Sequence, residues 1–279
     1  MTAQGRIYFY EERKLMNEAA QRAAARLNYV VEGRGPRVAL VHGVGGVMQN
    51  WEGVVARLKD RFELVRYDLR GHGESEKVPG PYTLNDFVND HVALLEELGW
   101  DSAHLVGFSL GAIIAQAIAI EQPERVGKVV LISGIAGRTE AERAKAQERA
   151  SALAQGGATT HLDWAVDRWF TREFQQAHPE IVEERKRQAR SQDPGCYAAA
   201  FRVLADYDLA DELHTIQHET LVMTGELDEG STPRMARLMA ERIAGARLEI
   251  LPGLKHSVLL EAPELIASKL GAFLAEGAR

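Results

Sequence analysis

Short apolar runs alternate with longer amphipathic stretches over most of this chain. A continuous apolar run predicts a strand buried on both faces of a sheet, and apolar residues at helical spacing predict a helix that covers the sheet. The predicted strands are a possible edge strand at 7–10, a half-buried strand at 27–31, and apolar runs at 38–41, 62–67, 103–106, 129–132, 220–224 and 247–251. Their regular alternation with helices predicts an α/β fold with a mostly parallel central sheet flanked by helices.

The alternation stops after the sixth predicted strand, at 129–132. From Arg138 to about Ala205 no segment has the pattern of a buried strand, and charged helical stretches occur instead at 140–153 and 179–190. A helical cap inserted after the sixth strand explains this change of pattern. The expected division is an N-terminal appendage (1–25), a core (26–137 and 206–279) and a helical cap (138–205).

The sequence Gly107-Phe108-Ser109-Leu110-Gly111 lies between a predicted strand and an apolar helix. In a Gly-x-Ser-x-Gly turn the glycines let a strand pass directly into a helix, and the serine is held in a strained backbone with its hydroxyl exposed. The N-terminus of the helix directs free N–H groups toward the point where an anion forms. We therefore expect Ser109 to be a nucleophile and the N–H of Leu110 to be one donor of an oxyanion hole.

A glycine-rich loop, His42-Gly43-Val44-Gly45-Gly46, follows the predicted strand at 38–41. It does not fit a dinucleotide-binding turn, because Met48 occupies the place of the third glycine. The glycines instead allow the backbone to approach a ligand closely. The N–H of Val44 is therefore the second expected oxyanion donor.

A second glycine-rich turn follows the predicted strand at 62–67 and contains Asp68, Arg70 and His72. His72 lies between two glycines in a tight turn, which favours a structural role over that of a catalytic base. We expect Asp68 and Arg70 to pair with each other or with the backbone of the loop.

Two polar side chains follow the ends of the last two predicted strands, where open α/β sheets place their active sites. Asp228 follows the strand at 220–224, and His256 follows the strand at 247–251. A serine hydroxyl needs a base, a histidine can accept and return its proton near pH 7, and a carboxylate fixes the tautomer of that histidine. We therefore expect Ser109, Asp228 and His256 to form a catalytic triad, with Glu226 on the same loop as the alternative acid.

Composition narrows the possible partners. The formal net charge of −7 argues against nucleic acid or an anionic membrane surface as the main partner. Cys196 is the single cysteine, which excludes an internal disulfide and fits a reducing compartment, and a partly buried thiol is expected there rather than a catalytic one. No apolar run is long enough to span a bilayer, so a cytoplasmic protein is expected. The motifs require no metal and no cofactor.

Together these motifs resemble those of the α/β-hydrolase superfamily over residues 26–279. The chain order Ser109, Asp228, His256 is the order in which that fold carries its triad. Within the superfamily the chain is most similar to 3-oxoadipate enol-lactonases. The similarity lies in the sequences Gly80-Pro81-Tyr82-Thr83, Arg168-Trp169-Phe170-Thr171, Gly195-Cys196-Tyr197-Ala198-Ala199 and Ile243-Ala244-Gly245-Ala246-Arg247. This resemblance implies that the cap and the serine turn enclose a small carboxylated lactone. The serine opens the lactone ring, and water then releases the product from the serine.

The expected function is therefore hydrolysis of a small ester or lactone by a cofactor-free serine hydrolase, with a homo-oligomer as a possible assembly. Phe108, Arg138, Trp164 and Trp169 are the candidate substrate contacts. For Arg138 two roles are open, pairing with the substrate carboxylate or exposure to solvent. The same triad also fits hydrolysis of a C–C or amide bond in a small carboxylated catabolite, or perhydrolysis with peroxide. A non-catalytic ligand receptor on the same scaffold is the alternative from another class. Epoxide hydrolase and dehalogenase chemistry is disfavoured, because it needs a carboxylate in place of the serine.

Overall fold

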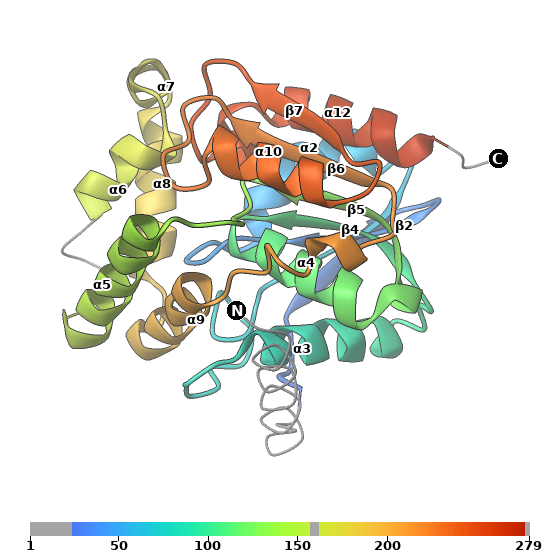
Figure 1. Ribbon diagram of the computed structural model, residues 1–279, viewed down its shortest axis with the longest axis horizontal. Coiled ribbons are helices and arrows are strands. Elements are labelled where there is room, and N and C mark those ends of the chain that lie inside the picture. Colours follow the sequence, from blue (N-terminus) through green and yellow to red (C-terminus); the bar gives the residue numbers. More distant parts are fainter. Residues whose placement is uncertain (1–23, 157–161, 277–279) are drawn as a thin grey trace.

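The computed structural model describes residues 24–156 and 162–276, and there seven strands form one sheet (Figure 1). The strand order is β1-β3-β2-β4-β5-β6-β7. The strands are β1 (Tyr29–Gly33), β2 (Arg37–Val41), β3 (Glu63–Tyr67), β4 (Ala103–Phe108), β5 (Val126–Ile132), β6 (Thr220–Gly225) and β7 (Arg247–Leu251). Only β1 runs antiparallel to its neighbour, so the predicted mostly parallel sheet is confirmed.

Helices cover both faces of the sheet, as the apolar runs predict. One face packs against α2 (Glu52–Leu58), α11 (Val258–Glu261) and α12 (Pro263–Ala275), and the other against α3 (Leu84–Glu97), α4 (Leu110–Glu121) and α10 (Pro233–Arg242). Within β2, Val38 and Leu40 face the first layer, whereas Ala39 and Val41 face the second. A strand buried on both sides must be apolar at every position, which is why these strands read as continuous apolar runs. In the described part of the core, short 3-10 helices lie at Met48–Trp51, Pro123–Arg125 and Leu213–Thr215.

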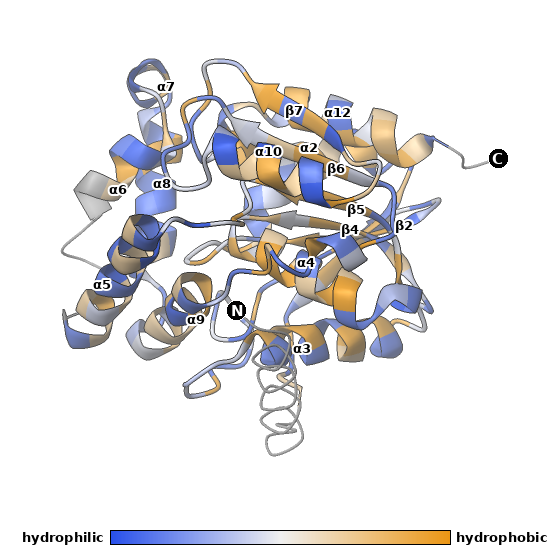
Figure 2. Ribbon diagram, viewed as in Figure 1, coloured by the Kyte–Doolittle hydropathy of each residue, from blue (hydrophilic) through white to orange (hydrophobic). Residues whose placement is uncertain are grey.

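Between β5 and β6 the described residues form five helices, which lie together beyond one end of the sheet (Figure 1). We call them the cap: α5 (Glu140–Gly156), α6 (Leu162–Trp169), α7 (Arg172–Ala177), α8 (Pro179–Arg190) and α9 (Pro194–Asp206). Figure 2 colours α7 and α8 largely hydrophilic, in contrast to the apolar central strands. The cap has two small apolar cores of its own, one between α5 and α9 and one among α6, α7 and α8. The residues described between β5 and β6 thus form helices and no strand.

The predicted strand at 7–10 and nearly all of the predicted appendage (1–25) lie outside the described residues. For this reason the strand that precedes the cap, which is sixth in the sequence-based count, is the fifth of the described strands.

The strand register brings distant loops to the same edge of the sheet. Val41 pairs with Gly107, Ile132 pairs with Met223, and Gly225 pairs with Leu251. The loops that follow β2, β4, β6 and β7 therefore emerge side by side, beneath the cap. This is the position at which open α/β sheets bind their ligands.

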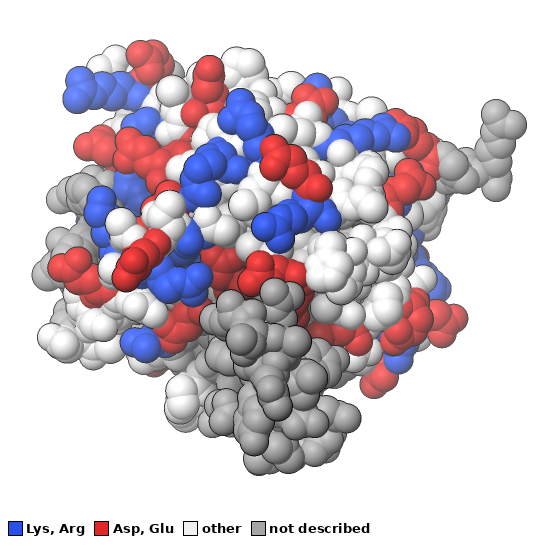
Figure 3. All heavy atoms as spheres, viewed as in Figure 1, with Lys and Arg blue, Asp and Glu red and all other residues white. Residues whose placement is uncertain are grey.

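Positive and negative side chains are interspersed on the face shown in Figure 3. Where this view shows described residues, the two signs are mixed rather than gathered into one extended patch. Within residues 24–156 and 162–276, none of the helices is both long enough and apolar enough to cross a lipid bilayer.

Candidate active site

Ser109 occupies a strained turn between β4 and α4. Its backbone has φ 56° and ψ −114°, a conformation that side-chain-bearing residues rarely adopt. The flanking glycines permit two close approaches, because a Cβ on Gly107 would lie 2.1 Å from the Gly111 oxygen and a Cβ on Gly111 would lie 2.3 Å from the Val41 oxygen. The two glycines of the motif are therefore required by packing, and together they hold Ser109 at the end of β4.

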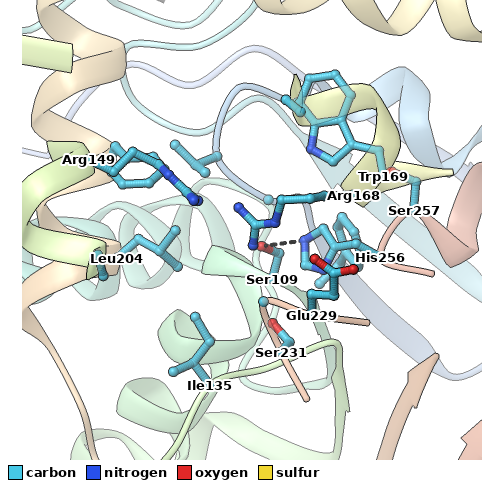
Figure 4. A pocket seen from close by; sticks show the side chains of 18 of the residues that line it. Ser109, Ile135, Arg149, Arg168, Trp169, Leu204, Glu229, Ser231, His256 and Ser257 are labelled. Carbon is cyan, nitrogen blue, oxygen red and sulfur yellow. Dashed lines mark hydrogen bonds between the residues drawn. The ribbon is translucent and has the colours of Figure 1, made fainter. Parts of the chain in front are cut away.

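Ser109, His256 and Asp228 form a continuous chain of polar contacts. The Ser109 Oγ atom lies 3.1 Å from His256 Nε2, the contact dashed in Figure 4, and His256 Nδ1 lies 2.7 Å from Asp228 Oδ2. Burial alone would raise the pKa of Asp228, but the adjacent His256 and two backbone N–H groups hold that pKa below its usual value. The two N–H groups belong to Gly230 and Ser231, and each donates to Asp228 Oδ1 over 2.9 Å. Asp228 is thus an ionised carboxylate facing the imidazole.

Glu226, the alternative acid, is not part of this chain of contacts. Its side chain is exposed and accepts a hydrogen bond from the N–H of Gly253. The loop that carries His256 passes directly over Gly225, where a Cβ would lie 2.3 Å from the Lys255 oxygen. Of the two predicted acids, Asp228 and Glu226, the structure brings Asp228 to His256.

The two expected oxyanion donors belong to segments that adjoin Ser109. Leu110 is the first residue of α4, and the Val44 loop comes close to the serine, because a Cβ on Gly43 would lie 2.8 Å from Ser109 Cβ. Within the described part of the chain, neither the N–H of Val44 nor that of Leu110 donates to another protein group. Both donors are therefore available to a ligand next to Ser109.

Two buried histidines hold the Val44 loop from beneath. His72 Nε2 accepts from the N–H of Gly45 over 3.1 Å, and His42 Nε2 accepts from the N–H of Leu69 over 3.0 Å. Burial lowers the pKa of both histidines, to about 3 for His72, so both rings are neutral. Since both ring nitrogens of His72 are occupied by backbone groups, its role is structural, as its position between glycines predicts.

Asp68 and Arg70 support the same loops without contacting each other. Asp68 accepts from the backbone N–H groups of Met48 and Glu74, as expected of a loop-stabilising carboxylate. Arg70 is fully buried and pairs with Asp86 and Asp90 on α3. The expectation that Asp68 and Arg70 contact loop backbone or each other therefore holds for Asp68 and is wrong for Arg70.

A cavity of about 340 Å³ lies between the cap and Ser109. Such a volume fits a small-molecule ligand. Its apolar wall includes Phe108, Ile135 and Leu204, and its cationic side chains come from the cap. In Figure 4 the Arg168 side chain extends over Ser109. The Arg149 side chain points toward Ser109 from the opposite side of the cavity. The cationic residues that line the cavity are Arg138, Lys145, Arg149, Arg168 and Arg185.

The positive charge of Arg168 affects the ionisation of Arg149, whereas the carboxylates of Asp228 and Glu229 affect that of Arg168. Burial and then the positive charge of Arg168 lower the pKa of Arg149 to about 10, and burial also lowers the pKa of Arg168. Both guanidinium groups line the cavity, so a negatively charged ligand group next to them is favoured electrostatically. The sequence prediction did not include Arg149, Arg168 or Arg185, although Arg168 is part of the quoted Arg-Trp-Phe-Thr sequence.

The four predicted substrate contacts have different outcomes. Phe108 and Trp169 line the cavity, and the Phe108 ring also packs on His256 with ring centroids 5.2 Å apart. Arg138 borders the cavity too, but its guanidinium donates to the carbonyls of Leu204, Ala205 and Tyr207 at the end of α9. The candidate pairing of Arg138 with a substrate carboxylate is therefore corrected to a bond between the two ends of the cap. Trp164 belongs to α6, but its side chain lies outside the described part of the structure.

Cys196 is buried in α9, where Asp193 caps the helix by accepting from the N–H of Cys196. Burial raises the pKa of the thiol, as expected of a structural cysteine. Over residues 24–156 and 162–276, no group of three or more His, Cys, Asp or Glu side chains has the arrangement of a metal site.

Residues 38–269 match the alpha/beta hydrolase family. The chain is 32% identical over 240 residues to 3-oxoadipate enol-lactonase 2 of Acinetobacter baylyi. This alignment covers 85% of this chain and 89% of that protein. It is 30% identical over 252 residues to (E)-2-((N-methylformamido)methylene)succinate hydrolase of the same organism, covering 88% of this chain and 93% of the other. Among solved structures, the enol-lactonase from Burkholderia xenovorans superposes with a TM-score of 0.85 at 28% identity, covering 90% of this chain and 97% of that one.

Proposed function

Because this chain belongs to the alpha/beta hydrolase family and is a hydrolase, we propose that it cleaves a small carboxylated ester or lactone through an acyl-enzyme on Ser109. The observation that carries the proposal is the unbroken contact from Ser109 through His256 to Asp228 at the edge of a cap-covered cavity. In this proposal the five cap helices and residues 138–205 as a whole close the site over its substrate.

The first step is attack by Ser109 Oγ on the carbonyl carbon of the substrate. His256 Nε2 takes the hydroxyl proton, and Asp228 stabilises the resulting imidazolium through Nδ1–H. The carbonyl oxygen becomes negative and is bound by the N–H groups of Val44 and Leu110, whose positions are set before the reaction begins. His256 then gives its proton to the leaving oxygen as the C–O bond breaks.

In the second step water hydrolyses the acyl-enzyme. His256 Nε2 accepts a proton from the water, the water oxygen attacks the acyl carbon, and the same two N–H groups bind the oxyanion again. The proton returns to Ser109 Oγ when the acyl bond breaks. For a lactone the leaving oxygen belongs to the acyl group itself, so a single opened product is released.

The cationic wall of the cavity supports a substrate that bears a carboxylate. Arg149 and Arg168 converge near Ser109, and a guanidinium pairs well with a carboxylate through two parallel hydrogen bonds. Two relatives of this chain are named for an oxoadipate enol-lactone and a substituted succinate. We therefore assign Arg149 and Arg168 to substrate binding, together with the apolar ring of Phe108.

A second candidate is hydrolysis of an amide-type bond by the same residues. It is favoured by the relative named for an N-methylformamido-methylene succinate, which is nearly as similar to this chain as the enol-lactonase. An amine leaves less readily than an enol, so this reaction depends more strongly on proton donation by His256.

Comparison of three substrates tests the proposal: 3-oxoadipate enol-lactone, a carboxylated nitrophenyl ester and an N-acyl enamine bearing a succinate. We expect turnover of the lactone and the ester, stoichiometric labelling of Ser109 by a fluorophosphonate, and no turnover by the Ser109→Ala variant. Turnover of the enamine alone would favour the second candidate. Absence of both labelling and turnover in the wild type would indicate a non-catalytic receptor instead.

A further inference from the structure

Arg185 on α8 is a buried cation that, within the described part of the chain, contacts a backbone carbonyl and an indole and forms no ion pair with a carboxylate. Its exposed fraction is 8%, and its Nη1 donates over 2.7 Å to the carbonyl oxygen of Gly45. The guanidinium also lies over the indole of Trp169, with Cζ 4.2 Å from the ring centroid. Because a buried charge is costly unless its environment compensates it, these two contacts are what keep the side chain in place.

The Gly45 carbonyl belongs to the loop that carries one proposed oxyanion donor, Val44. On its other side Gly45 is fixed to the core, because its N–H donates to the neutral ring of His72. Gly45 also has a φ of +66°, and a Cβ there would lie 2.5 Å from the Tyr197 ring of α9. The loop is thus held between a histidine of the core and an arginine of the cap.

Trp169 connects the same arginine to the histidine loop. Its indole stacks on Arg185, and its backbone oxygen accepts from the N–H of Ser257 over 2.9 Å. Ser257 follows His256 directly in the chain. One pair of contacting cap residues therefore bonds to the loops on both sides of Ser109.

We propose that Arg185 and Trp169 form a clamp through which the cap positions the Val44 N–H and the His256 imidazole relative to Ser109. This inference rests on the proposed function. Both residues are positioning residues, because they act through the backbones of Gly45 and Ser257. Displacement of a reacting group by about 1 Å can lower a rate on the order of a hundredfold, so such a clamp affects the chemical step.

The rival role for Arg185 is direct contact with the substrate anion, since it also lines the cavity. The two roles differ for a neutral substrate. A residue that only binds a carboxylate has no effect on hydrolysis of p-nitrophenyl acetate. A residue that positions the oxyanion donor lowers kcat for this ester with little change in KM, because the lost interaction is made in the transition state.

The test uses the full chain with Arg185→Gln, Trp169→Leu, the double variant and the control Arg187→Gln. Arg187 lies two residues away on α8, is largely exposed and pairs with Glu184 one turn earlier. For p-nitrophenyl acetate we expect kcat to fall about tenfold or more in each clamp variant, with KM within about twofold. We also expect the double variant to be no slower than the slower single variant, because the two residues act as a unit. Arg187→Gln should match the wild type.

Hydrogen–deuterium exchange supplies a readout that does not depend on activity. In Arg185→Gln we expect faster exchange in peptides that span 43–51 and 255–262, and unchanged exchange in α3. If Arg185→Gln does not fold, Arg185→Lys replaces it, because lysine keeps a donor but loses the planar face that stacks on the indole.

An unchanged kcat for the neutral ester, or unchanged exchange in both loops, would overturn the clamp. A rise in KM for the carboxylated ester alone would assign Arg185 to substrate binding instead. A separate result would contradict the proposed function: a fluorophosphonate would not label Ser109 in the wild-type chain. In that case the exchange data alone would decide whether Arg185 and Trp169 hold the two loops.

Discussion

Asp228 lies against the far side of the His256 imidazole, with Oδ2 2.7 Å from Nδ1, and is almost completely buried. Two backbone N–H groups hold its other carboxylate oxygen, so the carboxylate cannot rotate away without losing them. This arrangement fixes the ring so that Nε2 faces Ser109. Three hydrogen bonds thus hold the Asp228 carboxylate in its position against His256.

The Asp228→Asn variant should lose most of its activity. An amide in this position favours the wrong imidazole tautomer and removes the charge that stabilises the imidazolium, so we expect kcat to fall on the order of 10³- to 10⁴-fold. Glu226→Gln on the same loop is the matched control and should stay within about twofold of the wild type, because Glu226 contacts Gly253 and not His256. Steady-state hydrolysis of a nitrophenyl ester measures both. A larger loss in Glu226→Gln would reverse the assignment of the acid.

Arg149→Gln should reduce the preference for anionic substrates. Loss of a charged hydrogen bond of about 1.5–3 kcal/mol predicts a fall of about 10- to 100-fold in kcat/KM for a carboxylated ester. A neutral ester of the same acyl length should change by less than about threefold, and the exposed Arg187→Gln should affect neither. Equal losses for the charged and neutral esters would contradict a carboxylate contact at Arg149.

Arg138→Gln should lower stability and leave substrate preference unchanged. Arg138 donates to three carbonyls at the end of α9, and loss of these bonds at a partly buried site predicts destabilisation of about 1–3 kcal/mol. Arg202→Gln is the control on α9, because Arg202 makes only an exposed pair with Asp206 that contributes about 0.5 kcal/mol or less. Urea unfolding measures both variants. A changed ratio of charged to neutral ester turnover in Arg138→Gln would restore the original expectation of a substrate contact.

Stability should fall as the pH decreases below about 6.5, in part because of His91. Burial lowers the pKa of His91 to about 4, whereas in the unfolded chain it has an ordinary pKa of about 6.5. The unfolded state therefore binds more protons between these values, so this contribution is complete above pH 6.5 and is lost as the pH falls toward 4.

The expected slope from one such histidine is up to about 1.4 kcal/mol per pH unit. His91→Gln removes this titration while keeping a polar partner for the Tyr67 hydroxyl, which lies 3.1 Å from His91 Nδ1. Urea unfolding between pH 4.5 and pH 7 should therefore give a shallower pH dependence in the variant. Parallel curves for the wild type and His91→Gln would show that His91 does not titrate as its burial implies.

Most of the sheet was predictable because its pattern is local. Each buried strand is recognisable from four to six consecutive residues, and the serine turn from five, without knowledge of any neighbour in space. The pairing of Arg70 was not predictable in the same way. Its partners Asp86 and Asp90 lie on a helix that follows a long loop, so only the packing of α3 against the sheet brings the charges together.

The chain by itself determined the alternation of strands and helices, the insertion after β5 and the position of Ser109, because hydrophobic periodicity and the steric needs of glycine act over a few residues. The tertiary structure decided which acid meets His256, since Asp228 and Glu226 are two residues apart and only the turn of their loop directs one inward. It also decided that Arg138 bonds to α9, whereas Arg149, Arg168 and Arg185 face the cavity. Periodicity cannot distinguish a charged helix face that meets water from one that meets a cavity, because that difference depends on how the cap helices pack over the sheet.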